Sequence, residues 1–175
     1  MKRTHPQLTT LETGVWEFCR AYAKRPAIGQ RLVVYGNNGC GKSHAARAII
    51  AWARAVALML PTVCDEANMA LATAHYVHWP SLLKLLKSGH WDALEEYFNV
   101  SLLALDDVGA EHDPSAFGVS ELYLLMERRA KRWTIITTNV KPEAWDGNFE
   151  RRIASRMLRN TRLVALDKVP DYGSI

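Results

Sequence analysis

Eight residues near the start of the chain have the composition and spacing of a loop that binds phosphate groups. Residues 36–43 read GNNGCGKS and match the pattern G-x-x-x-x-G-K-[ST] in full. The glycines allow backbone conformations that turn successive N–H groups toward one anion. Lys42 adds a positive charge for the β- and γ-phosphates of ATP, and the Ser43 hydroxyl suits Mg²⁺. The candidate nucleotide-binding residues are Gly36, Asn37, Asn38, Gly39, Cys40, Gly41, Lys42, Ser43 and, directly after the loop, His44.

Two adjacent carboxylates follow an apolar run in the middle of the chain. Leu102 to Leu105 reads as a buried strand that leads straight into Asp106 and Asp107. Open α/β sheets bind ligands at the carboxyl ends of their strands, so these acids are expected beside the phosphate loop. We expect Asp106 to share the Mg²⁺ with Ser43, and Asp107 to polarise the attacking water. Glu111, in the following loop, is a weaker candidate for that second role.

Two further segments carry polar groups that suit a triphosphate. Residues 134–138 (TIITT) read as a buried strand that ends at Asn139, whose amide could hydrogen-bond the γ-phosphate or the water. On the predicted helix 151–158, Arg152 and Arg156 are spaced i and i+4 and share a face. Either arginine could stabilise charge on the γ-phosphate of a neighbouring subunit, and the less favoured alternatives are a solvated basic helix or a DNA-backbone contact.

Apolar runs and helical periodicity alternate along the chain, and their order predicts how these residues are positioned. A helix from about Leu11 to before Pro26 precedes the first strand, and a long helix follows the phosphate loop up to Pro61. Five strands separated by helices predict a three-layer α/β fold with a mainly parallel sheet. The expected strands are 31–35, 76–79, 102–105, 134–138 and 162–166, and the further helices are 81–89, 91–98, 119–132 and 151–158.

Taken together, these segments resemble the AAA+ ATPases. GNNGCGKS, LLALDDVG, TIITTN and RIASRM look like Walker A, Walker B, sensor 1 and the arginine-finger box of that family. More narrowly, they are similar to the DnaC-type helicase loaders and the IstB-type transposition helpers, over about residues 11–172. The resemblance implies an ATPase in which Asn139 senses the γ-phosphate and Arg156 acts on a neighbour's ATP. The implied fold is the AAA+ type of P-loop NTPase with a five-stranded sheet.

The resemblance also implies a biological setting. A DnaC-like protein would act in DNA replication, bind single-stranded DNA and load a replicative helicase, whereas an IstB-like protein would assist a transposase. Both would form homo-oligomers with ATP at the subunit boundary. The chain departs from DnaC-type loaders in having only about ten residues before the first helix, and in reading Gly173-Ser174-Ile175 where the family can supply a second sensor arginine.

Length and composition limit the organisation of the protein. The 175 residues, of which 49% are apolar, fit one AAA+ domain with a short tail at 1–10, a possible insertion at 61–74 and no separate lid domain. No apolar run is long enough to cross a membrane, and the first residues lack the core of a signal peptide, which predicts a cytoplasmic protein. Three cysteines without CxxC spacing predict neither disulfides nor zinc; they are Cys19, Cys40 and Cys64.

Charge is distributed unevenly. No Lys or Arg lies between Lys87 and Arg128, where nine acids occur, whereas residues 128–162 carry ten basic residues against three acids. Such a basic segment is compatible with solvated helix faces, with DNA phosphates, or with the acidic face of an identical neighbour. In an oligomer, it would face the acidic phosphate-binding side of the next subunit.

Six tryptophans are candidates for stacking on bases of single-stranded DNA. Trp52, Trp79 and Trp133 occupy apolar positions of expected elements and are predicted to lie in the core. Trp91 and Trp145 lie near element ends and are the better candidates for exposure.

Two other functions fit the phosphate loop. A small-molecule kinase has the same loop and a similar size, but it needs an acceptor pocket and an arginine-bearing lid. A nucleotide-gated adaptor would bind ATP with negligible turnover. The acid pair followed by the TTN strand end favours hydrolysis over the kinase reaction, and the adaptor stays open as an alternative.

Overall fold

The computed structural model describes residues 6–24, 29–59, 73–110, 117–148 and 150–171, and the features below concern these ranges. Cys64, Glu111 and residues 61–72 of the expected insertion lie outside them. Cys19 and Cys40 are both buried, as expected of small apolar side chains.

Five parallel strands form one sheet in the order β2-β3-β4-β1-β5. The expectation of a five-stranded, mainly parallel sheet is confirmed, and every strand pairing is parallel. Because the strands are parallel, all five carboxyl ends lie at the same edge. The strands are β1 (Arg31–Tyr35), β2 (Ala74–His78), β3 (Leu102–Val108), β4 (Trp133–Thr138) and β5 (Thr161–Ala165).

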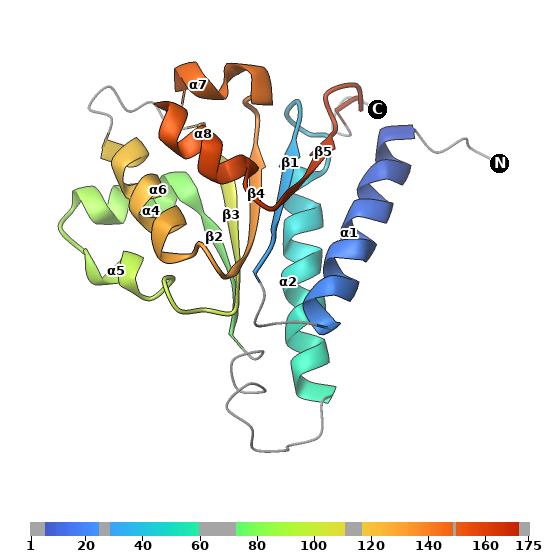
Figure 1. Cartoon of the computed structure of the whole chain (residues 1–175), viewed down its shortest axis with the longest axis horizontal. Helices are drawn as coiled ribbons and strands as arrows, with labels where there is room; N and C mark the ends of the chain where they lie inside the picture. The colour runs from blue at the N-terminus through green and yellow to red at the C-terminus, as the bar shows by residue number, and fades with distance from the viewer. Residues whose placement is uncertain (1–5, 25–28, 60–72, 111–116, 149, 172–175) are drawn as a thin grey trace.

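Helices cover both faces of the sheet and complete three layers. Figure 1 shows α1 and α2 side by side on one face, and α4, α6 and α8 on the other. In the part of the chain that the structure describes, none of these helices is both long and apolar enough to span a bilayer. The helices are α1 (Pro6–Lys24), α2 (Lys42–Met59), α4 (Trp79–Lys87), α5 (Asp92–Glu95), α6 (Phe117–Arg128), η1 (Pro142–Ala144), α7 (Trp145–Asn148) and α8 (Glu150–Leu158).

Alternation along the strands divides the core in two. On β1, Leu32 and Val34 pack under α1 and α2, whereas Val33 points to the opposite face, where α4, α6 and α8 lie. This period of two is the side-chain geometry of a strand that is buried on both faces. The sheet is therefore held rigidly between two apolar layers, and its carboxyl edge offers a fixed platform for the loops.

Trp145 is a correction to the sequence-based expectation. Its side chain is fully buried rather than exposed, and the indole N–H donates to the Val140 carbonyl at 3.0 Å. The reason is that η1 and α7, which the periodicity did not indicate, follow β4 directly and turn the ring into the core beneath α8. Trp79 and Trp133 are buried as predicted, Trp52 is half-buried, and Trp91 is 53% exposed as expected.

Arg129 is a buried cation without a carboxylate partner among the described residues. Its guanidinium donates to the carbonyls of Tyr97, Val100 and Trp133 and to the Thr134 hydroxyl, at 2.6 to 3.2 Å. These bonds join the end of α6 to the starts of β3 and β4. Arg129 thus satisfies acceptors that would otherwise be buried without a donor.

We expect Arg129→Ala to lower the free energy of unfolding by about 3 kcal/mol or more, because it leaves several buried carbonyls without donors. Chemical denaturation measures the effect. The control is Lys131→Ala, an exposed position in the same turn, which should change stability by no more than about 0.5 kcal/mol. Equal stabilities for the two variants would show that the bonds of Arg129 contribute little.

Candidate nucleotide site

The phosphate loop connects β1 to the start of α2 at the carboxyl edge of the sheet. Gly39 and Gly41 have φ angles of 68° and 96°, in the region that side-chain-bearing residues rarely adopt. These conformations are what allow the loop to turn its N–H groups inward, and α2 directs its positive end to the same place. The loop therefore has the backbone of an anion-binding cradle.

The Lys42 side chain is buried against the backbone of this loop. It is 5% exposed, and Nζ donates to the carbonyls of Gly36 at 3.0 Å and Asn37 at 2.6 Å. The Cys40 sulfur lies 3.8 Å from Nζ. A buried ammonium with neutral partners of this kind gains strongly from an added negative charge. Ser43 follows on the first turn of α2 and is half-buried, while His44 is exposed.

The segment after β5 packs against the loop from outside. The Asn37 amide donates to the Asp167 carbonyl at 2.8 Å, and the N–H of Leu166 donates to the carbonyl of Tyr35 at 2.7 Å. The Asp171 carboxylate lies against Gly39, where a side chain would collide with it. These contacts fix the position of the loop relative to the sheet.

Strand β4 brings the other candidates to the loop because it lies between β3 and β1. The N–H of Gly36 donates to the Thr138 carbonyl at 3.2 Å, so the loop begins beside the end of β4. On the other side of β4, the Thr138 hydroxyl donates to the Val108 carbonyl at 2.6 Å. Asn139 follows immediately and is exposed. The structure thus brings together the phosphate loop, the acidic pair and Asn139.

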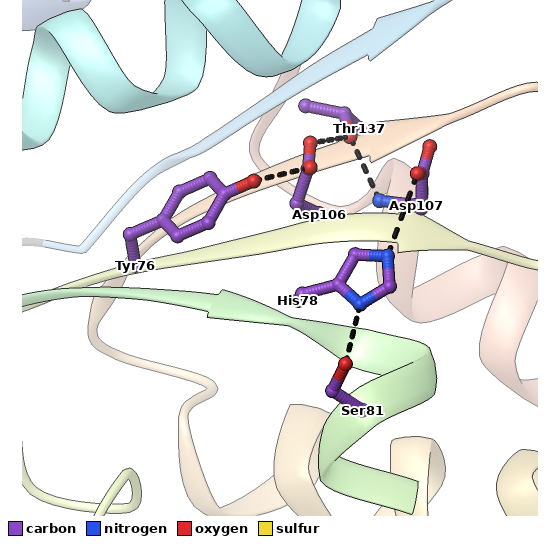
Figure 2. Close-up of polar contacts among 6 residues, drawn as sticks. All are labelled: Tyr76, His78, Ser81, Asp106, Asp107 and Thr137. Atoms are coloured by element: carbon purple, nitrogen blue, oxygen red, sulfur yellow. Dashed lines mark hydrogen bonds and ion pairs between the residues drawn. The ribbon is translucent and has the colours of Figure 1, made fainter.

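Asp106 is 2% exposed and both of its carboxylate oxygens accept hydrogen bonds (Figure 2). The Thr137 hydroxyl donates to Oδ1 at 2.5 Å, and the Tyr76 hydroxyl donates to Oδ2. Burial and the bond to Asp106 raise the pKa of Tyr76 to about 12, so the phenol stays protonated and remains a donor at neutral pH. The Arg47 guanidinium lies 4.8 Å from the centre of the Tyr76 ring.

Asp107 has a different environment from its neighbour. Its φ of 59° lies in the left-handed region, and the register of β3 with β4 shifts between Leu105 and Val108, as at a β-bulge. The bulge turns the half-exposed Asp107 carboxylate out of the buried strand, while its N–H donates to the Thr137 hydroxyl at 3.0 Å. His78 Nε2 lies 3.6 Å from Asp107 Oδ2, and its Nδ1 lies 2.7 Å from the Ser81 hydroxyl (Figure 2).

The donor atoms of this site suit Mg²⁺. A carboxylate and a hydroxyl, from Asp106 and Ser43, are hard oxygen ligands. Among the described residues no group of three or more His, Cys, Asp and Glu side chains could hold a metal by itself. Mg²⁺ commonly binds in just this way, through one or two protein oxygens, with water and nucleotide phosphates completing its shell.

Arg156 does not join the phosphate loop of its own chain. It lies on α8, makes an ion pair with Glu127 on α6, and donates to the Tyr123 hydroxyl at 3.0 Å. Three residues further along, the Arg159 carbonyl accepts from Arg31 at 2.8 Å, so this end of α8 lies near the start of β1, about 13 Å along that strand from Tyr35. Arg152 is on the same helix, but its side chain lies outside the described part of the structure.

Sequence reasoning missed three residues of the site: Tyr76, His78 and Thr137. All three belong to strands, where Tyr, His and Thr are ordinary residues, and each makes its contact across to Asp106 or Asp107. In a parallel sheet, residues near the carboxyl ends of neighbouring strands lie side by side. Side chains near the ends of β2 and β4 therefore flank the end of β3, and this relation could have identified them.

Neither a protein-family model nor a curated protein sequence matches the chain. Solved structures do. A crystal structure of the DnaC helicase loader is 18% identical with a TM-score of 0.71, over 94% of this chain and 93% of that one. The structure of DnaI is 16% identical with a TM-score of 0.70, over 94% and 87%. Replication initiator DnaA, bound to AMPPCP and single-stranded DNA, is 19% identical with a TM-score of 0.63, over 86% of this chain and 44% of that one. The chain therefore has the fold of these AAA+ P-loop proteins.

Proposed function

We propose that this chain, which has the AAA+ fold of the DnaC helicase loader, is an ATP-hydrolysing protein that acts in DNA replication as a DnaC-like loader of a replicative helicase. One observation carries the proposal. The phosphate loop, Asp106, Asp107 and Asn139 come from three adjacent parallel strands and meet at one edge of the sheet. The similarity to DnaC over 93% of that chain supports the replication role.

The residues of the site have different roles in binding and hydrolysing ATP. The loop N–H groups and Lys42 bind the β- and γ-phosphates, and Lys42 leaves its carbonyl partners to do so. Ser43 and Asp106 would hold Mg²⁺, which neutralises phosphate charge when bound. Asp107, turned outward by the bulge, accepts a proton from the attacking water, and Asn139 orients that water or contacts the γ-phosphate. His44 adjoins the loop as a further contact.

We also propose that the protein binds single-stranded DNA through the exposed ring of Trp91, which lies beside the half-buried ring of Phe117. Trp91 and Phe117 lie with ring centroids 5.7 Å apart, and the Lys87 ammonium lies 5.9 Å from the Phe117 centroid. An exposed ring next to a cation suits a base stacked on its face and a phosphate beside it. The solved DnaA structure with single-stranded DNA is a relative in fold that binds this ligand.

The whole chain is proposed to act as one AAA+ domain in a homo-oligomer, ring or helix, with ATP between subunits. The support is the position of Arg156, which lies away from its own phosphate loop and could meet the ATP of a neighbouring copy by exchanging its partners Glu127 and Tyr123.

The test is phosphate release from ATP and Mg²⁺ by the purified protein, with and without single-stranded DNA. We expect release without any added phosphate acceptor, whereas a small-molecule kinase would need one. Lys42→Ala should weaken ATP binding by about a hundredfold or more, because it removes the charge that faces the phosphates. Fluorescent-nucleotide titration measures the binding.

Lys84→Ala, an exposed lysine on α4, is the matched control and should bind ATP normally. ATP binding by the wild type without turnover, even with DNA and oligomers present, would instead indicate a nucleotide-gated adaptor. Sizing the protein with a non-hydrolysable ATP analogue and single-stranded DNA tests the assembly. Capture of a transposase in place of a helicase would assign the protein to the IstB-like alternative.

A further inference from the structure

Three loops are bonded together at the edge of the sheet opposite the nucleotide site. They are the turn after α6, the turn after α8, and the residues that lead into β1 (Figure 1). The N–H of Gly29 donates to the Lys131 carbonyl at 3.1 Å, that of Arg31 to the Asn160 carbonyl at 3.0 Å, and the Asn160 amide to the Gly29 carbonyl at 2.8 Å. Side chains on these loops therefore share one rigid surface, which we name the basic edge.

Cations predominate on the basic edge. Two of them have neutral partners: Arg132 donates to the Asn99 carbonyl at 2.9 Å, and the Arg128 guanidinium lies 5.5 Å from the Phe98 ring centroid. Two carboxylates next to this surface have cationic partners: Glu127 pairs with Arg156, and Glu17 pairs with Arg162. The exposed or half-buried cations at these loops are Arg128, Lys131, Arg132 and Arg159, while Arg162, on the adjoining strand β5, is paired with Glu17.

Two buried arginines beneath this surface increase its positive potential. Burial, with a smaller contribution from the charges of Arg132 and Arg31, lowers the pKa of Arg129 to about 9. Burial also lowers the pKa of Arg31, with Arg159 and Arg156 adding to the effect and Glu127 opposing it. Arg31 donates to the Arg159 carbonyl at 2.8 Å, and its Nε finds no acceptor in the described ranges. The cations repel one another, and an anion bound here would relieve that repulsion.

A polar hollow of about 500 Å³ opens at the basic edge. Amide, hydroxyl and guanidinium groups of this kind are the side chains that contact phosphate oxygens of nucleic acids. Among the described residues that line the hollow none is aromatic, so these residues offer no platform for stacking bases. The lining residues are Gln30, Leu158, Asn160, Thr161 and Arg162.

We propose that the basic edge binds the phosphate backbone of double-stranded DNA without reading its base sequence. Duplex DNA carries about one negative charge per 1.7 Å of helix axis, which matches cations spread over three loops of a rigid edge. The inference rests on the proposed DNA-related function and adds a second DNA surface, distinct in residues and in chemistry from the Trp91 and Phe117 pair. A protein with both surfaces could hold a duplex beside an unpaired strand.

The test is the double substitution Lys131→Glu and Arg159→Glu in the full chain. Both side chains are exposed, so the fold should be preserved. Fluorescence anisotropy with a labelled duplex of mixed sequence, over a range of KCl concentrations, measures affinity. We expect affinity to fall by about tenfold or more, and the log–log salt slope to fall by about 2, since two phosphate contacts are lost.

The matched control is Arg20→Glu with Lys84→Glu, which changes the formal net charge equally, from +4 to 0, at exposed sites on α1 and α4. It should keep the wild-type salt slope. Equal slopes for the two double variants, or no duplex binding by the wild type, would overturn the inference. So would unchanged duplex binding with a smaller assembly, which would mean that the basic edge meets the acidic face of a neighbouring copy. ATP hydrolysis by the double variants, measured without DNA, should equal that of the wild type. Failure of the ATPase proposal can therefore be distinguished from failure of the duplex-binding proposal.

Discussion

Replacing Arg156 with alanine should reduce ATP hydrolysis by about 10³-fold or more while leaving ATP binding intact. The expected loss is large because an arginine supplied in trans neutralises charge that develops on the γ-phosphate only as the bond breaks. In the isolated chain Arg156 is held by Glu127 and Tyr123, far along the sheet from its own phosphate loop. Assembly must therefore exchange these partners for the phosphate of the next subunit.

Turnover per chain should then rise with protein concentration, because the active site is completed only in the oligomer. Steady-state phosphate release and equilibrium nucleotide binding separate the two effects. Arg151→Ala, an exposed arginine on the same helix, is the control and should hydrolyse ATP at the wild-type rate. The ion pair with Glu127 is at the surface and its loss should change stability little, so unfolding would not explain an inactive variant.

A mixing experiment gives a sharper result. Arg156→Ala retains Lys42, and Lys42→Ala retains Arg156, so an equal mixture should restore about a quarter of the sites if one chain completes the site of the next. Two inactive variants that stay inactive when mixed, in assemblies of normal size, would contradict a role in trans. Full ATPase activity of Arg156→Ala alone would show that Arg156 takes no part in hydrolysis.

The strands and the nucleotide loop could be predicted from the sequence because their signals are local. The run RLVVY is apolar and β-branched and stops at a glycine, which indicates a buried strand, and β1 occupies the same residues. The phosphate loop contains glycines in backbone conformations that no other residue adopts readily. The glycines at positions 39 and 41 therefore predict the positive φ angles found there. In both cases the residues of one short segment are enough to predict its backbone conformation.

The hydrogen bonds of the site were not predictable in this way because they join different strands. Thr137 looks like any β-branched strand residue, yet its hydroxyl is within 3.0 Å of both an Asp106 oxygen and the Asp107 nitrogen. Trp145 was wrongly expected to be exposed, since helices as short as η1 and α7 contain too few residues to show a period. The location of the site was thus accessible from the sequence, whereas the partners of its acids required the sheet.

The different contacts of Asp106 and Asp107 predict that substitutions at the two positions impair different steps of ATP binding and hydrolysis. Asp106 is buried, and each of its carboxylate oxygens accepts a hydrogen bond from a hydroxyl group, which fixes the orientation of the carboxylate. Asp107 is half-exposed, and its carboxylate faces His78 at 3.6 Å. An amide at Asp106 should chiefly weaken Mg²⁺-dependent binding of ATP. An amide at Asp107 should chiefly affect the chemical step.

We therefore expect Asp107→Asn to lower the rate of phosphate release by about 10² to 10⁴-fold, with ATP affinity changed little, because an amide cannot take the proton of the attacking water. Asparagine is the right substitution since it tolerates the left-handed backbone that φ of 59° demands, whereas alanine would add strain. Single-turnover assays with saturating protein isolate this step from nucleotide exchange. Asp106→Asn, measured in parallel, should lose the Mg²⁺ dependence of nucleotide binding. If Asp107→Asn instead binds ATP poorly and hydrolyses what it binds at the normal rate, the carboxylate belongs to the binding site and another group activates the water.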